Sequence, residues 1–281
     1  MLFNTIIFPK IALNIGPKSK TLNHLEKSSP ILPWLDQILL FFISLIANIF
    51  SAFAGGGAGL IQFPVLIFLG LPFSIALATH KLASVALGVG ATIRNLQTHR
   101  LKSSLVINIV LYGVPGVIIG ANIILFVPDR SAEISLGVLT IALGLYSILK
   151  PELGLNPSQR ELTIFQNILG GCVLFFIGML NGSLTSGTGL FVTLWLVRWY
   201  GLDYKLAVAH TLILVGLFWN GSGAITLGLL AQIQWTWLPA LLLGSLLGGF
   251  IGAHLAIIKG NKWIKRVYET ITILVGIKLI Y

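Results

Sequence analysis

Two short clusters of glycine and hydroxyl residues interrupt an otherwise apolar chain, one within FAGGGAG and one within NGSLTSGTG. Glycine permits the left-handed and extended backbone that breaks a helix, and a helix that starts after a break presents unpaired N–H groups and a positive dipole end. Such an end binds anions without needing a charged side chain. We therefore predict a ligand-facing role for Gly55, Gly56, Gly57 and Gly59 in the first cluster and for Ser183, Thr185, Ser186, Gly187, Thr188 and Gly189 in the second. A purely structural kink is the alternative.

Ionisable and hydroxyl side chains follow each cluster. ALATHK contains Thr79, His80 and Lys81, and AVAHT contains His210 and Thr211. Ionisable residues inside a membrane segment are costly and are therefore candidates for function. We expect Lys81 to contact an anion, the two histidines to hydrogen-bond it or carry a coupling proton, and the two threonines to complete the pocket. The alternatives are a lysine that extends to the membrane surface and histidines that only support packing.

The composition sets the environment of these residues. Of 281 residues, 56% are hydrophobic and only 9% are charged, whereas a soluble domain has about 25% charged residues. So few polar residues cannot cover a water-exposed surface, which indicates a multi-pass protein of the cell membrane. The net charge of +10 comes from basic loops between apolar segments, so nucleic acid is not an expected partner.

The apolar segments are long and lack the alternation of barrel strands, which favours an all-α polytopic protein. They cover residues 34–54, 57–70, 72–97, 104–127 and 132–149, and then 164–184, 187–200, 202–227, 235–258 and 263–280. Each half thus has four long segments and one short one. Fourteen residues rise about 21 Å as a helix, less than the ~30 Å membrane core. Matched short, glycine-interrupted segments indicate the binding site of a transporter.

An internal repeat of about 131 residues relates the halves. Matching positions include Gly57, Gly59 and Leu60 with Gly187, Gly189 and Leu190, and Gly116 and Gly120 with Gly248 and Gly252. We predict a basic N-terminal arm at 1–33, a first membrane repeat at 34–149, a polar linker at 150–162 and a second repeat at 163–281.

Loop charge predicts the orientation of the two repeats. Loop 94–102 is basic and its counterpart 226–234 is uncharged, whereas loop 258–266 is basic and its counterpart near 128–131 is balanced. Because basic loops face the cytoplasm, the halves are expected to be inverted relative to each other.

The four glycines 116, 120, 248 and 252 are expected to form close helix contacts instead of a ligand site.

The acidic residues favour an anion over a cation as the substrate. Seven of the eight lie in the arm, at segment ends or in loops, with Glu269 as the one candidate for a buried position. Cation and proton pumps commonly need buried carboxylates. The sequence contains no nucleophile–base–acid series, no metal-ligand spacing and no Walker loop, so we expect neither an enzyme nor a cofactor or metal. The single cysteine, Cys172, excludes an intrachain disulfide.

The segment GGGAGLIQFPVLIFLGLPFSIALATHKLASVALG, with its glycine run, Pro64, Gly-Leu-Pro at 70–72 and Ala-x-Ala-Thr at 76–79, resembles the sulfite exporter TauE/SafE family of membrane permeases. The resemblance continues through the second-half copy and TILVGIKLI, and covers about residues 35–281. It implies duplicated halves that move sulfite, sulfoacetate or related sulfonates. The chain departs from the family pattern at TSGTG, where members often have a glycine run, and at Ala209-His210-Thr211, where Gly-Thr-Ser or Ala-Thr-Ser is usual.

These features predict a secondary transporter of a small, sulfur-containing anion such as sulfite or an organosulfonate. One half would move against the other to alternate access to a site near the midplane. An anion channel would use the same donors without alternating access. A membrane scaffold or assembly protein would instead use the basic arm and loop 258–266 for docking. The sequence leaves open whether the chain forms a homo-oligomer.

Overall fold

The computed structural model describes the chain except for residues 1–32, 99–100, 125–128, 159–161, 185–186 and 281. The predicted N-terminal arm, apart from its last residue, and the candidates Thr185 and Ser186 therefore lie outside the described residues. Residues 37–281 form one compact unit. The predicted linker is described from Lys150 to Ser158, where Ser158 N donates to Gly201 O at 2.8 Å.

The described residues form helices and no strand, as the sequence predicts. The first half contains α1 (Pro33–Ala54), the 3-10 turn η2 (Ala58–Leu60), α2 (Gln62–Phe68), α3 (Phe73–Asn95), α4 (Ser103–Ile123) and α5 (Asp129–Ile148). The second contains α6 (Ile164–Leu184), α7 (Thr188–Arg198), α8 (Tyr204–His210), the π-helix η4 (Thr211–Trp219), α9 (Asn220–Leu230), α10 (Leu238–Lys259) and α11 (Asn261–Ile280). Each expected apolar segment therefore corresponds to one helix, or to the continuous run of α8, η4 and α9.

Six helical segments in the described part of the chain are long and apolar enough to cross a membrane: α1, α3, α4, α6, the continuous run from α8 to α9, and α10. Their outer surfaces carry large apolar side chains such as Leu111 on α4 and Phe176 on α6, which are each 62% exposed. Exposed apolar surface on this scale is stable only in contact with lipid. The chain is therefore a multi-pass membrane protein.

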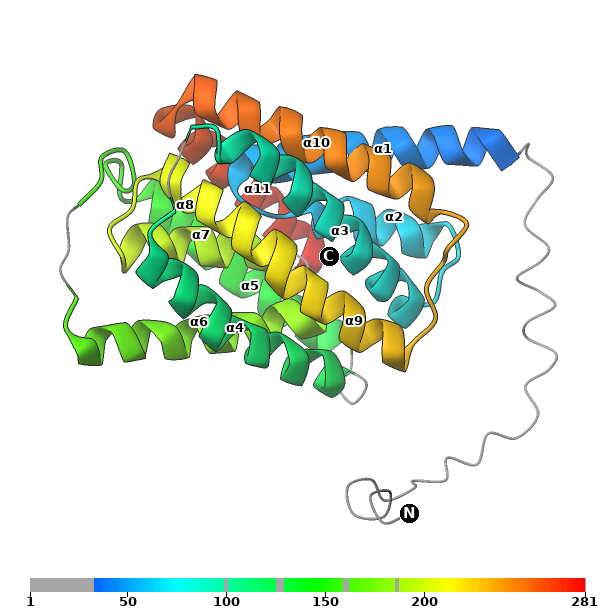
Figure 1. Ribbon diagram of the computed structural model, residues 1–281, viewed down its shortest axis with the longest axis horizontal. Coiled ribbons are helices and arrows are strands. Elements are labelled where there is room, and N and C mark those ends of the chain that lie inside the picture. The colour runs from blue at the N-terminus through cyan, green and yellow to red at the C-terminus, as the bar shows by residue number, and fades with distance from the viewer. Residues whose placement is uncertain (1–32, 99–100, 125–128, 159–161, 185–186, 281) are drawn as a thin grey trace, which may run out of the picture. The chain divides into compact units, whose positions relative to one another are not determined.

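Glycines bring helices from opposite halves into backbone contact (Figure 1). A Cβ atom added to Gly248 of α10 would lie 2.6 Å from the Leu45 carbonyl oxygen of α1, and Gly116 of α4 closely approaches the Phe175 carbonyl of α6. The positions correspond in the repeat. Helix α10 of the second half thus packs on α1 of the first, and α4 of the first packs on α6 of the second. The two halves interdigitate through these contacts.

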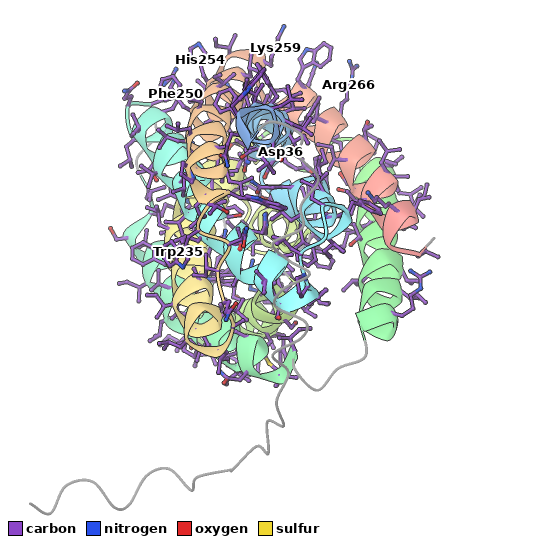
Figure 2. All side chains as sticks on the ribbon, turned by 90° about the vertical axis from the view of Figure 1, so that its right-hand side faces the viewer. Asp36, Trp235, Phe250, His254, Lys259 and Arg266 are labelled. Carbon is purple, nitrogen blue, oxygen red and sulfur yellow. The ribbon has the colours of Figure 1, made fainter. Side chains whose placement is uncertain are left out.

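Helices α5 and α11 pack against each other, as Figure 2 shows for the pair on the right of the view. They contact α7 and α8 through hydrogen bonds. Tyr268 of α11 donates to the Leu190 carbonyl of α7 at 3.2 Å, and Ser147 of α5 bonds the Tyr204 hydroxyl of α8 at 3.0 Å. Arg198 of α7 donates to the Tyr146 hydroxyl of α5 at 2.7 Å. The pair is therefore held against α7 and α8.

Candidate functional site

The first glycine cluster breaks the chain between α1 and α2. Helix α1 ends at Ala54, where the N–H groups of Gly55 and Gly56 both donate to the Ser51 carbonyl, at 2.9 and 2.8 Å. The φ angles of Gly55, Gly56 and Gly57 are 87°, 141° and 108°. L-residues with a side chain rarely adopt this region, so the sequence needs glycine at each of the three positions.

The second cluster breaks the chain between α6 and α7, and the two breaks touch. Gly187 has φ 73° and precedes the first turn of α7. A Cβ atom added to Gly56 would lie 2.6 Å from both Cα and C of Gly189, so neither position has room for a side chain. The Thr193 hydroxyl of α7 donates to the Gly55 carbonyl at 2.8 Å and links the breaks further.

A polar cavity of about 40 Å³ lies at this junction. Among the predicted residues, those that line it are Gly56, Gly57, Gly59, His80, Thr188, Gly189 and Thr211. Ser51, Ser84, Asn181 and Asn220 add polar groups, and the described residues of the lining include no Asp, Glu, Lys or Arg. Among the described residues, no group of three His, Cys, Asp or Glu side chains could hold a metal ion.

The π-helix η4 forms one wall of this cavity through Thr211, Leu212, Val215 and Gly216. π-helical turns are rare and occur often at functional sites. Helix α3 approaches η4 closely at the same depth, because a Cβ atom added to Gly88 would lie 2.6 Å from the carbonyl carbon of Gly216. Glycine therefore brings α3 and η4 together at the cavity.

His80 connects the cavity to a buried chain of polar side chains. Its Nδ1 lies 2.8 Å from Gln62 Oε1, and its Nε2 lies 3.2 Å from the Ser84 hydroxyl. Gln62 Nε2 donates to the Ser44 hydroxyl at 3.0 Å, and Ser44 bonds Ser245 of α10 at 3.0 Å. With Gln62 oriented in this way, its oxygen accepts the Nδ1 proton and neutral His80 accepts from Ser84.

Lys81 is fully buried, and its partners among the described residues are oxygen atoms of two asparagines. Its ammonium donates to Asn181 O and Oδ1, each at 2.6 Å, and to Asn220 Oδ1 at 3.2 Å. The side chain is 0% exposed, which rules out the extension to the membrane surface. Lys81 stands behind the cavity wall that the two asparagines form, so it does not reach the cavity directly.

Thr79 and His210 occupy equivalent positions in the repeat and make equivalent hydrogen bonds. Gln234 N donates to the Thr79 hydroxyl at 3.0 Å, and Lys102 N donates to His210 Nε2 at 3.1 Å. These bonds hold the chain ahead of α10 and α4, respectively. Neither residue lines the cavity, and Ser183 also does not, since its hydroxyl bonds the Met179 carbonyl at 2.9 Å.

A second pair of equivalent bonds lies next to the cavity. Thr193 Oγ1 lies 3.0 Å from Thr211 Oγ1, 18 residues along, and accepts its hydrogen bond because its own hydrogen goes to the Gly55 carbonyl. Gln62 and His80 likewise interact across 18 residues in the first half. Sequence reasoning identified His80 and Thr211 but missed Gln62, Thr193, Asn181 and Asn220. An amide or hydroxyl side chain within an apolar segment is the signal that could have identified them, because buried polar groups in lipid need partners.

A larger cavity of about 770 Å³ opens between α1, α2 and α11. Its walls are mainly apolar and include Phe68 and Leu274, and Arg266 and Lys278 of α11 also line it. Ser51, Gly56 and Gly57 line this cavity and the small polar one alike. The glycine break of the first half therefore separates two adjoining spaces.

The sequence matches the family described as Sulfite exporter TauE/SafE over residues 40–279. The chain belongs to this family. It is similar to the probable membrane transporter protein YfcA of Escherichia coli K12, with 31% identity over 265 residues that cover 93% of this chain and 94% of the relative. A probable membrane transporter protein of Haemophilus influenzae is 28% identical over 244 residues, 86% of this chain and 94% of the relative. No solved structure matches the chain significantly.

Membership in the TauE/SafE family identifies the protein as a membrane permease, in agreement with its six candidate membrane spans and the names of its relatives. The match begins at residue 40 and therefore leaves out the predicted N-terminal arm. It includes both glycine breaks and every described residue that lines the small cavity.

Proposed function

We propose that this TauE/SafE permease is a secondary transporter of a small, sulfur-containing anion such as sulfite or an organosulfonate. The observation that carries the proposal is the meeting of the two glycine breaks at a small polar cavity. Non-helical backbone at membrane depth is stable only where protein or a water-filled cavity satisfies it. Paired, interrupted helices are also where transporters of duplicated structure bind substrate.

The chemistry of the cavity favours an anion. Hydroxyl, amide and imidazole groups line it, and none of the described lining residues has a carboxylate. The ammonium of Lys81 lies directly behind the wall, and its three hydrogen-bond partners among the described residues are uncharged oxygens. A buried charge without a counter-charge is costly, so a bound anion would offset the positive potential of Lys81.

The size of the cavity favours a small ligand. A volume of about 40 Å³ exceeds the roughly 10–15 Å³ that one water molecule needs in the same measure. A sulfite ion or the head group of a sulfonate is of this order, whereas a large organic molecule would require the cavity to widen. An organic tail would have room in the adjoining apolar cavity between α1, α2 and α11.

The contacts of α5 and α11 support alternating access. The pair bonds α7 and α8, whereas the large cavity lies between α11 and α2, where Lys278 Nζ is 5.8 Å from the centroid of the Phe68 ring. Because α2 and α7 are equivalent in the repeat, the opposite state would place the pair against α2 and open a cavity beside α7. The two halves would thus exchange conformations during transport.

The positions of the basic residues support inverted halves. Arg94, at the end of α3, donates to His254 of α10 at 2.8 Å. His254 and Lys259 lie near the C-terminal end of α10, which leads into the basic loop 258–266. The basic loops that the positive-inside rule assigns to the cytoplasm thus lie at the same end of the molecule.

His80 would carry a coupling proton, and the Ser84 hydroxyl would turn to accept a hydrogen bond from the protonated ring.

Counterflow in proteoliposomes tests the proposed function. Vesicles loaded with unlabelled sulfite should accumulate radiolabelled sulfite transiently, and sulfonates should compete whereas simple cations should not. A channel would equilibrate the label without accumulation. A scaffold would give no exchange with any anion although the protein is folded, and it would co-purify with a stable partner. Either of these results would overturn the carrier assignment.

A further inference from the structure

Hydrogen bonds to Lys81 fix the orientation of the side-chain amides of Asn181 and Asn220. Lys81 Nζ donates hydrogen bonds to the side-chain oxygen of Asn181 at 2.6 Å and to that of Asn220 at 3.2 Å. An amide has its oxygen and its NH₂ group on opposite branches, so fixing the oxygen directs the NH₂ group away from the lysine. Both residues line the small cavity, which lies on the other side of the wall from Lys81.

The NH₂ groups have donor capacity that the described residues do not use. Asn181 Nδ2 donates one hydrogen to Thr188 Oγ1 at 2.8 Å, and no other described residue accepts its second hydrogen. For Asn220 Nδ2, no acceptor lies within hydrogen-bond distance among the residues that the structure describes, and the side chain is half-buried at the cavity. Buried amide groups normally have partners, so an unused donor at a cavity indicates a ligand acceptor.

We infer that Asn220, together with Asn181, donates hydrogen bonds to the anion, and that Lys81 is a positioning residue that orients both amides. This inference rests on the proposed function and specifies how its site recognises an anion. An oxyanion supplies several acceptor oxygens at once, which matches two NH₂ groups that line the same cavity. The ammonium stabilises the anion through its charge and through the amides.

The substitution Asn220→Asp isolates the donor role. The carboxylate keeps an oxygen for Lys81 and nearly the same shape, but replaces the cavity-facing NH₂ donor with an acceptor that repels an anion. Asn156→Asp is the matched control, because it makes the same chemical change at an exposed position between α5 and α6. Asn220→Ser is a second variant, with a shorter donor that no longer reaches the same point.

Ligand-induced thermal stabilisation of the purified protein by sulfite and by methanesulfonate measures binding separately from transport. We expect the wild type and Asn156→Asp to be stabilised alike, and Asn220→Asp and Asn220→Ser to need at least ten-fold more anion for the same shift. Lys81→Met should also weaken binding. If both Asn220 variants fold and bind like the wild type, the inference is wrong and the proposed function stands. If the wild type neither binds nor transports any of the anions, the proposed function fails as well.

Discussion

The contact between the two glycine breaks makes Gly56→Ala a severe substitution. The methyl group would lie 2.6 Å from two backbone atoms of Gly189 and 2.8 Å from Leu190 N. Backbone atoms in a close-packed region cannot move aside without displacing the whole segment, so overpacking costs about 1–3 kcal/mol. The residue also has φ 141°, and such a conformation costs a non-glycine residue about 1–3 kcal/mol. Together the two effects predict a loss of roughly 2–6 kcal/mol.

Two other glycines separate these contributions. Gly70 has φ 97° and an added Cβ atom would meet nothing within 4 Å, so Gly70→Ala should lose only the conformational part, about 1–3 kcal/mol. Gly221 lies within α9 with open space around it, so Gly221→Ala should be neutral or stabilise by up to about 1 kcal/mol. The expected order of stability is therefore Gly221→Ala first, then Gly70→Ala, and Gly56→Ala last.

This order is measured by heating the purified protein and recording the loss of its monodisperse chromatographic peak. Sulfite uptake by each variant measures transport. We expect Gly56→Ala to have the lowest midpoint and no measurable transport. Equal midpoints for Gly56→Ala and Gly70→Ala would show that the two breaks do not touch, and would refute the geometry on which the site depends.

Three further predictions concern other parts of the molecule. Gln62→Leu leaves His80 Nδ1 without its acceptor, which should lower the free energy of unfolding by about 1–3 kcal/mol. It should also weaken the dependence of anion uptake on the pH gradient. If that dependence is unchanged, His80 does not carry the coupling proton. His210→Ala should lower the yield and thermal midpoint but leave the KM for the anion unchanged, because His210 bonds Lys102 N outside the cavity; a large rise in KM would contradict this placement. Ile67 of α2 and Leu274 of α11 line the large cavity, and closure of this cavity must bring them together. In a Cys172→Ser background, the pair Ile67→Cys and Leu274→Cys should therefore form a disulfide that stops transport until it is reduced. Absence of the cross-link in actively transporting vesicles would argue against closure at this cavity.

The sequence predicted the helices well because their signals are local. An apolar run of about twenty residues specifies a membrane helix, and glycines 55–57 and 187 specify where helices break. The structure confirmed helices and no strand among the described residues, with the short helices α2 and α7 at the expected places, and the family match confirmed membership in the TauE/SafE family. The π-helix η4 was not predicted, because no residue type in TLILVGLFW marks the change in hydrogen bonding.

The site was harder to predict, because it depends on tertiary contacts. Repeat position alone put His210 and Thr211 together, yet adjacent residues on η4 and α8 face different surroundings and only Thr211 reaches the cavity. Lys81 looked like a direct ligand, but the two asparagines that take its hydrogen bonds lie 100 and 139 residues away in the sequence. No spacing rule relates residues at such distances, and the substrate role of these side chains remains a prediction.

Selenite provides the most direct test of the central claim, that the cavity between the glycine breaks holds the transported anion. It has the shape and charge of sulfite, and its selenium scatters anomalously, so a crystal of the protein grown with selenite would locate the anion. We predict one anomalous peak inside the small cavity, bounded by Gly56, Thr188 and Asn220. A peak confined to the large apolar cavity between α2 and α11, or no peak although selenite competes with sulfite for transport, would contradict the claim.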